Sequence, residues 1–465
     1  MKKYIFSILF IMSTHIIIGQ TTVSGNQSGV WTAAGSPYQV TGNITIPSGQ
    51  TLTVEAGVSV IFQGYYRLYV NGKIIANGTE SEPILFTAAD HNTGWGGIRL
   101  DGTPDVSSFH YCKFEYGKTS ATGGYPDMHG GAFVLKDADA EFYHCRFENN
   151  DATGDDNGMG GAVYCMNTGS ATQTITRFEY CVFINNHTYG EGGAIKFTND
   201  GMTQIIRCQF INNNAGYGGG AVFYYTAYNA QIIQSLFYNN SADNSGGGAI
   251  KTLNPQTDLH LTNCTFAYNY AYGAGEGGAL NLDYADLIAV NSIFYGNQQT
   301  YGDEIKVGMN ATAQIDYCDV EMPANATGSH NLNNVDPLFV NGTQGDFHLQ
   351  SNSPCIDAGT DVGLPFYGTA PDLGCYEYET TGMLPLSLSG IKTFPNPVKD
   401  YLHFKPALKT GLVRIIDLQG KIIDEQKINH SLSRLDMSDM PAGYYILMYK
   451  KDNSIYRQKI LKLKP

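Results

Sequence analysis

The sequence contains little charge and, after its first 19 residues, no long apolar run. Only 15% of the 465 residues are Asp, Glu, Lys or Arg. No stretch after Gly19 reaches the roughly 20 apolar residues that a membrane-spanning helix needs. The central part also lacks the apolar period of a helix. These absences exclude a transmembrane helix from the mature chain and favour a turn-rich all-β protein, as do the 54 glycines.

Several signatures of common activities are also missing. The sequence has no nucleotide-binding glycine loop, no His-Glu-x-x-His zinc pair and no strand-to-helix turn carrying a nucleophilic serine. The net charge is -14. Residues 391–465 contain 14 Lys or Arg and 7 Asp or Glu, a net charge of +7. The rest of the chain contains 14 Lys or Arg and 35 Asp or Glu, a net charge of -21. The large acidic part is therefore no partner for nucleic acid.

What the sequence does contain is a repeat. A Gly-Gly-Ala-apolar tetrad occurs six times, with its alanines at positions 132, 162, 194, 221, 249 and 279, in steps of 30, 32, 27, 28 and 30. Degenerate copies lie at Gly96-Gly97-Ile98 and at 302–305. Self-similarity at such a period indicates a stacked array of identical units.

A second motif lies between the tetrads: Cys or Ser, then Phe two residues later, then Asn three residues after that. Its members are Cys145/Phe147/Asn150, Cys181/Phe183/Asn186, Cys208/Phe210/Asn213, Ser235/Phe237/Asn240, Cys264/Phe266/Asn269 and Ser292/Phe294/Asn297.

A unit of about 28 residues with short strands and no helix can close only by coiling, so that each rung pairs with the next as parallel strands about 4.8 Å apart. Stacking turns each repeated position into a ladder. We expect Cys and Phe to point inward, the ladder Asn to occupy a tight bend in left-handed conformation with stacked amides, and the tetrad glycines to form the opposite corner. All three ladders are structural in this interpretation.

The tetrads and Phe-x-x-Asn turns resemble the repeats of chlamydial-type polymorphic outer-membrane proteins and, more broadly, the right-handed parallel β-helix of pectin-lyase-like proteins. The resemblance implies that fold. It says little about activity, because the fold hosts lyases, hydrolases and adhesins.

The chain divides into six segments. Residues 1–19 resemble a secretory signal peptide, with Lys2 and Lys3 before an apolar stretch. N-terminal rungs follow at 20–96, repeat rungs at 97–321, a C-terminal cap of the β-helix at 322–379 and a linker at 380–390. Residues 391–465 form a separate β-sandwich. Of the nine cysteines, Cys355 and Cys375 are the pair to test for a disulfide.

The last segment carries four motifs in order: Phe394-Pro395-Asn396-Pro397, Val413–Asp417 before Gly420-Lys421, Pro441–Leu447, and a basic end at Lys459–Lys462. It resembles the C-terminal sorting domain of type IX secretion substrates. The resemblance implies contact with that secretion machinery through residues 391–465, transfer across the outer membrane, and release or display at the cell surface.

Candidate chemistry is sparse. Asp155-Asp156 is similar to the paired aspartates of polygalacturonases but stands in a Gly/Asn turn without their other motifs. The tightest acidic cluster is Glu276, Asp283, Asp303 and Glu304, whose hard oxygens could hold Ca²⁺; a solvated acidic edge is the alternative. No other cofactor is indicated. For a lyase, Glu276 and Asp303 with Lys306 as base would be the catalytic set.

A column beside the tetrads is the stronger candidate. Residues that alternate with inward ones there are predicted to face outward: Arg99, Val134, Tyr164, Lys196, Phe223, Lys251, Asn281 and Lys306. Cations and aromatics repeated once per rung suit a long saccharide. A hydrated strand face that prevents lateral aggregation is the plainer interpretation.

The sequence thus predicts a secreted, surface-displayed β-helix that binds a polysaccharide or cell-surface glycan or acts as an adhesin. A polysaccharide lyase or glycoside hydrolase is one alternative, and a passive structural stalk is another.

Overall fold

The structure is a computed structural model that describes residues 20–120, 124–154, 157–169, 175–254, 257–273, 277–299, 303–378, 392–394, 398–417, 422–441, 443–451 and 454–462. The predicted signal peptide (1–19), the linker (380–390), Asp155-Asp156, Glu276, the Pro395–Pro397 motif and Gly420-Lys421 lie outside these residues. The chain forms two compact units, a large N-terminal one and a small C-terminal one.

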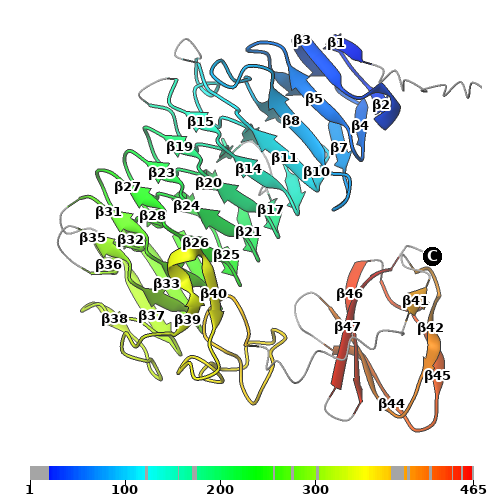
Figure 1. Cartoon of the computed structure of the whole chain (residues 1–465), viewed down its shortest axis with the longest axis vertical. Coiled ribbons are helices and arrows are strands. Elements are labelled where there is room, and N and C mark those ends of the chain that lie inside the picture. Colours follow the sequence, from blue (N-terminus) through cyan, green and yellow to red (C-terminus); the bar gives the residue numbers. More distant parts are fainter. Residues whose placement is uncertain are drawn as a thin grey trace, which may run out of the picture. The chain divides into compact units, whose positions relative to one another are not determined.

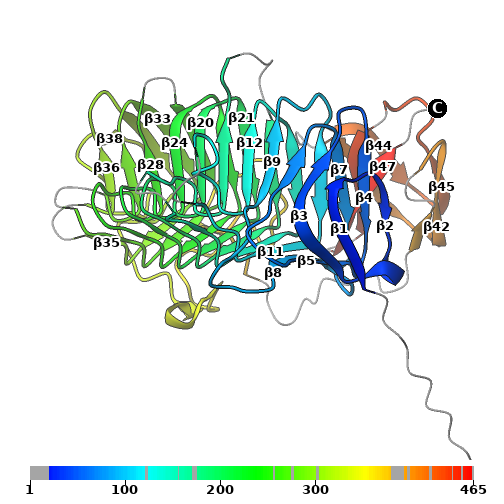
Figure 2. The same ribbon diagram turned by 90° about the horizontal axis from the view of Figure 1, so that it is seen from above.

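The large unit is a parallel β-helix (Figures 1 and 2), as predicted. Each full rung contributes a tetrad strand, a middle strand, a Cys-x-Phe strand and, from β15 onward, a two-residue strand, and each pairs in parallel with its counterparts one rung away.

The tetrad strands are β6 (Leu68–Val70), β9 (Ile98–Asp101), β12 (Phe133–Lys136), β16 (Val163–Met166), β20 (Ile195–Asp200), β24 (Val222–Ala227), β28 (Ile250–Thr252), β32 (Leu280–Leu282) and β36 (Ile305–Val307). The middle strands are β2 (Gly29–Trp31), β4 (Thr51–Glu55), β7 (Lys73–Asn77), β10 (Ser107–His110), β13 (Ala140–Tyr143), β17 (Ile175–Glu179), β21 (Met202–Ile206), β25 (Ala230–Ile233), β29 (Thr257–Thr262), β33 (Ala285–Val290), β37 (Thr312–Asp316) and β38 (Ala326–Thr327).

The Cys-x-Phe strands are β5 (Ser59–Phe62), β8 (Ile84–Ala88), β11 (Cys112–Glu115), β14 (Arg146–Glu148), β18 (Val182–Ile184), β22 (Gln209–Ile211), β26 (Leu236–Tyr238), β30 (Thr265–Ala267) and β34 (Ile293–Tyr295). The two-residue strands are β15 (Asp151–Ala152), β19 (His187–Thr188), β23 (Asn214–Ala215), β27 (Ser241–Ala242), β31 (Tyr270–Ala271) and β35 (Gln298–Gln299). At the N-terminal end β1 (Thr21–Asn26), η1 (Ala33–Gly35) and β3 (Tyr38–Ile46) close the coil.

The predicted phenylalanine column fills the core. Phe183 and Phe210 stack with ring centroids 4.7 Å apart and planes 2° from parallel. The other contacts between neighbouring rungs are closely similar, at 4.5 to 4.8 Å, and the column runs through Phe147, Phe183, Phe210, Phe237, Phe266 and Phe294. These side chains are fully buried, so apolar burial and ring contact stabilise every rung against its neighbours.

The asparagine ladder is also present. In each rung the Asn side chain donates to the amide oxygen of the next Asn, as from Asn186 to Asn213 at 2.9 Å, and to a Phe carbonyl of the preceding rung. The same amide-to-amide bond, at 2.8 to 3.0 Å, connects the whole series of Asn150, Asn186, Asn213, Asn240, Asn269 and Asn297. Because these side chains are buried, the ladder satisfies polar groups that water cannot reach.

The left-handed conformation predicted for the ladder asparagines is wrong. None of the six has positive φ: Asn150, Asn186, Asn213, Asn240, Asn269 and Asn297. The left-handed residue is the one before each of them, namely Asn149, Asn185, Asn212, Asn239, Tyr268 and Gly296, with φ between 53° and 65°. The ladder Asn therefore points inward from the bend that its predecessor makes, because its amide must reach the neighbouring rungs.

The ladder ends at Glu304. Its carboxylate takes the place of a seventh amide and accepts the backbone N–H of Asn297 at 2.8 Å and the side-chain N–H at 3.2 Å. The other carboxylate oxygen is buried without a hydrogen-bond partner, and the side chain is only 8% exposed. Burial raises the pKa of Glu304 to about 7, although the bonds from Asn297 act in the opposite direction.

The two tetrad glycines are required for different reasons. The first has positive φ in five of the six tetrads, as at Gly192 (73°). The second lies against the next rung, and a Cβ on Gly220 would come within 2.1 Å of the Gly248 carbonyl oxygen. Any side chain there would force adjacent rungs apart.

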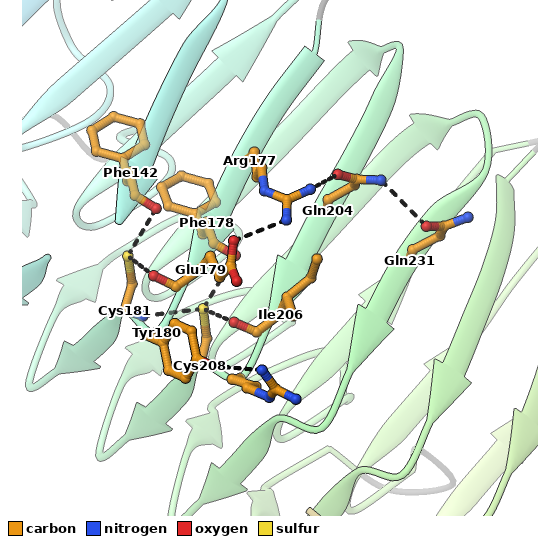
Figure 3. Close-up of polar contacts among 11 residues, drawn as sticks. Phe142, Arg177, Phe178, Glu179, Tyr180, Cys181, Gln204, Ile206, Cys208 and Gln231 are labelled. Atoms are coloured by element: carbon orange, nitrogen blue, oxygen red, sulfur yellow. Dashed lines mark hydrogen bonds and ion pairs between the residues drawn. The ribbon is translucent and has the colours of Figure 1, made fainter. Parts of the chain in front are cut away.

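All nine cysteines are buried and unbridged, so the disulfide considered between Cys355 and Cys375 is not formed. In the inward column, the Cys181 thiol donates to the carbonyls of Phe142 and Glu179, both at 3.5 Å (Figure 3). Ser235 accepts the Cys208 N–H at 3.1 Å with its hydroxyl, just as the Cys208 sulfur accepts the Cys181 N–H. Cys and Ser are therefore interchangeable in this column.

The segment expected to be a C-terminal cap has two parts. Residues up to about 335 close the end of the coil, where β38 pairs with β37 and Met322 packs against the core. The following hairpin, β39 (Phe339–Asn341), η2 (Gly342–Gln344) and β40 (Asp346–Leu349), lies against the side of the coil instead. Phe347 contacts the Tyr238 ring at 5.0 Å, so this part covers the outer face of the Cys-x-Phe sheet.

The small unit contains two antiparallel sheets, as predicted for a β-sandwich. One comprises β41 (Lys392–Phe394), β42 (Tyr401–Leu408) and β45 (Leu432–Asp436); the other comprises β43 (Gly411–Asp417), β44 (Ile422–Ile428), β46 (Gly443–Lys451) and β47 (Ser454–Lys462). Its separate core includes Leu402, Ile415 and Leu447.

Replacing Asn213 with Ala should destabilise the β-helix by roughly 3 kcal/mol, because two buried N–H groups of Asn186 lose their acceptor. Chemical denaturation of the full chain measures this effect. Asn214→Ala is the control, since that side chain bonds near the surface to Ser241, and it should cost less than about 1 kcal/mol. Equal losses in the two variants would show that the ladder contributes no special stability.

Glu304 should make the β-helix less stable as the pH rises. The folded-state pKa of about 7 exceeds the usual 4.5, so the folded form binds more protons between these values. Stability is therefore lost from about pH 4.5 to pH 7, by up to about 3 kcal/mol. Glu304→Gln, which keeps an acceptor oxygen, should remove this slope in melting temperature against pH. The variant Asp303→Asn, at the exposed neighbouring residue, should retain the slope. If the slope is unchanged in Glu304→Gln, Glu304 is not its cause.

Candidate functional site

The eight residues of the predicted stripe lie in one column across the tetrad strands. Pairings in direct register connect each member to the next, from Arg99 in β9 to Lys306 in β36. The alternation read from the sequence therefore placed all of them correctly on one face.

The expected exposure of this column is wrong. From Arg99 to Asn281 no member is more than 7% exposed, and Lys306 is half-buried. The loops before the tetrads fold over the strands. Ser245 in one such loop accepts hydrogen bonds from the Lys251 ammonium at 2.6 Å and the Asn281 amide at 2.9 Å. The column is thus a covered layer rather than a hydrated strand face.

The cover is incomplete over β16, β20 and β24, where a groove of about 600 Å³ remains. Two members of the predicted stripe, Tyr164 and Lys196, form part of its floor. Its lining is Tyr125, Met128, His129, Asn157, Met159, Tyr164, Glu191, Lys196, Thr198 and Tyr225.

The inward ladders contribute nothing to the groove lining. Their members are buried in the interior of the coil: Cys145, Phe147, Asn150, Cys181, Phe183, Asn186, Cys208, Phe210, Asn213, Phe237, Asn240, Cys264, Phe266 and Asn269. Their rings stack on one another and their amides bond to one another. These contacts hold adjacent rungs together, which is the structural role that the sequence predicts.

Aromatic rings form one wall of the groove. Tyr125 is 60% exposed and meets the His129 ring edge-on at 5.5 Å. The His129 ring in turn lies 4.4 Å from that of Tyr164. The Tyr125 hydroxyl contacts the Met166 sulfur at 3.2 Å. Burial raises the pKa of the Tyr164 hydroxyl, so Tyr164 remains neutral at physiological pH.

A partly buried ion pair also lines the groove. Lys196 bonds to the Glu191 carboxylate and lies 3.2 Å from the Met159 sulfur. Its ammonium group sits 4.7 Å from the centre of the Phe223 ring and 5.6 Å from that of Tyr225. Burial lowers the pKa of Lys196, while the charge of Glu191 and the hydrogen bond to it act in the opposite direction. Rings, a cation and a carboxylate thus meet in one concave surface.

The acidic cluster at the C-terminal rungs does not converge. Glu304 points inward at the asparagine ladder, Asp283 accepts the Met309 N–H at 3.1 Å, and Asp303 is exposed. Glu276, the remaining member of the Ca²⁺ and lyase sets, is outside the described residues. Among the residues that are described, no three Asp, Glu, His or Cys side chains are grouped to hold one metal ion.

The outer face of the middle sheet carries a second polar row (Figure 3). Arg177 in β17 donates to Gln204 in β21 at 2.5 Å, and Gln204 donates to Gln231 in β25 at 3.4 Å. Arg177 also pairs with Glu179 at 2.9 Å. These groups bond to one another along the sheet, which favours a structural role and leaves the groove as the candidate site.

Sequence reasoning missed Tyr125, His129, Tyr225 and Glu191 as groove residues. Tyr225 could have been found, because it lies two residues after Phe223 and so shares its face. Glu191 directly precedes a tetrad, where the covering loops return to the strand. Tyr125 and His129 gave no such signal, because their loop lies outside the periodic strands.

Family models match three parts of the chain. A pectate-lyase like β-helix domain matches residues 25–134, a Chlamydia polymorphic membrane protein repeat matches 180–198, and a secretion system C-terminal sorting domain matches 392–463. No curated protein matches the chain. No helix among the described residues has the length and apolar character that crossing a membrane requires. The chain is thus a β-helix protein exported through a type IX sorting domain, for secretion or display on the cell surface.

Proposed function

We propose that this exported β-helix binds a polysaccharide or cell-surface glycan in the groove over β16, β20 and β24. The observation that carries the proposal is the combination of exposed aromatic rings with a fixed cation and carboxylate in one open groove. Sugar rings have apolar faces that pack on aromatic side chains, and hydroxyl groups that bond to ions and amides.

The export route supports the same proposal. A protein secreted or displayed on the cell surface meets glycans of its own cell envelope and of its surroundings. The groove residues Tyr164, Lys196 and Tyr225 lie on neighbouring paired strands of the coil. This pairing fixes their spacing, which reduces the entropy lost on binding an extended polymer. An adhesin role follows if the bound glycan belongs to another cell.

A second candidate function, a polysaccharide lyase, is favoured by Lys196 alone. A lysine whose pKa is lowered by burial can act as the base in β-elimination. Its close pairing with Glu191 favours the ammonium form instead, which suits binding. Release of unsaturated uronate products by the natural protein, and not by Lys196→Gln, would establish the lyase.

Tyr125→Ala and Tyr225→Ala should each weaken glycan binding about tenfold, because each removes an aromatic surface from the groove. A glycan array with the full mature chain identifies the ligand, and calorimetry measures the affinities. Tyr272→Ala is the matched control, since Tyr272 is 58% exposed and lies outside the groove lining; it should bind normally.

Two results would contradict the proposal. Unchanged affinity in both groove variants would place any bound glycan elsewhere. A blank array combined with loss of cell adhesion on deletion of the protein would favour a passive stalk or a protein-binding adhesin.

A further inference from the structure

Two arginines lie close together at the N-terminal end of the covered column. Arg99 is its first basic member, and Arg67 directly precedes β6, whose Tyr69 pairs in register with Arg99. The degenerate tetrad makes room for both. A Cβ on Gly96 would lie 2.4 Å from the Arg67 side chain, and one on Gly97 would lie 2.5 Å from an Arg99 nitrogen.

The two guanidinium groups share a single carboxylate. Asp127 lies 2.8 Å from Arg67 Nη1 through one oxygen and 3.5 Å from Arg99 Nε through the other. Within the described part of the chain, neither arginine forms an ion pair with any other carboxylate. Arg99 is 5% exposed and Arg67 15%. The cluster therefore retains one positive charge in poorly solvated surroundings, where unbalanced charge is unfavourable.

The cluster also keeps unused donors. Nε of Arg67 is buried without a hydrogen-bond partner, and Nε of Arg99 is buried and faces the Asp127 carboxylate at 3.5 Å without forming a hydrogen bond. Burial and the neighbouring charge of Arg67 lower the pKa of Arg99 to about 10, so both side chains still carry their charge at neutral pH. Planar guanidinium groups with free N–H donors are suited to bind carboxylate, sulfate or phosphate oxygens.

This cluster adjoins the groove. Asp127 belongs to the loop that supplies Tyr125 and His129 to the groove wall, and Arg99 donates to the His129 carbonyl at 3.4 Å. Asp127 is the most exposed of the three charged residues, at 29%. An incoming oxyanion can therefore replace its carboxylate on the two arginines without dismantling the strands.

We infer that Arg67 and Arg99 form an oxyanion subsite at the end of the groove, which Asp127 occupies until the acid group of a charged sugar displaces it. The sugar part of this inference rests on the proposed glycan-binding function; the oxyanion site itself does not. The competing explanation is that Asp127 only anchors its loop to the sheet.

Binding of tetragalacturonate and of its methyl ester to the chain tests whether the subsite takes the acid group of a sugar. Esterification removes each negative charge and adds only one methyl group per carboxyl. We expect the acid to bind about tenfold more tightly than the ester. Arg67→Gln should abolish that difference and Arg67→Lys, which keeps the charge without the planar fork, should reduce it. Asp127→Asn should enlarge it by removing the competing carboxylate. Ester affinity should stay constant, which shows that the groove is intact.

Thermal shifts in sodium sulfate against sodium chloride of equal ionic strength test the oxyanion site without any sugar. Sulfate stabilises folded proteins in general because it is excluded from their surfaces, so Arg67→Gln provides the baseline. Relative to that baseline, sulfate should raise the melting temperature of the natural protein further, and that of Asp127→Asn by the largest amount. If neither saccharide binds and the glycan array is also blank while this sulfate pattern holds, the proposed function fails and the oxyanion site stands. A sulfate effect of equal size in the natural protein and in Arg67→Gln, or an acid preference that survives Arg67→Gln, would overturn the subsite and leave Asp127 as a loop anchor.

Discussion

The in-register parallel pairing of successive rungs is the constraint on which the rest of the structure depends. It places each side chain next to the equivalent side chain one rung away. The residue at each repeated position must therefore pack well against another residue of the same type. Phenylalanine meets phenylalanine in stacked contact, and each asparagine finds its acceptor in the next asparagine. The same pairing brings the second tetrad glycines so close that no side chain fits between them. The sequence repeats because every rung must meet this same packing requirement.

This constraint explains why so much of the fold could be predicted. Spacing alone assigned Phe183, Phe210 and Phe237 to one column, and the period-two alternation assigned Arg99 to Lys306 to one face. A position that recurs in every repeat unit shows the same residue type several times, and this repetition indicates whether its side chain points inward or outward. The error in placing the bend at Asn186 rather than Asn185 is of a different kind. Two adjacent asparagines satisfy the same pattern, and only the backbone shows which one turns.

The candidate site was less predictable, because its walls come from segments without a period. The loop carrying Tyr125 and Asp127 occurs in one rung only, and nothing in the repeat indicates that it folds over β12 and β16. The covering of the column, and the gap that remains over β20, depend on loop packing. The hairpin of β39 and β40 likewise lies on the flank of the coil rather than across its end, since Phe347 finds Tyr238 there. The repeated residues form the β-helix, whereas loop residues that occur in one rung only form much of the groove surface.

The unbridged cysteines have a consequence for maturation. Every thiol is buried in the interior, and burial raises the pKa of the Cys264 thiol to about 12. Folding therefore requires no disulfide, and so no thiol oxidase or disulfide isomerase. A reducing compartment would find no disulfide to break in this fold.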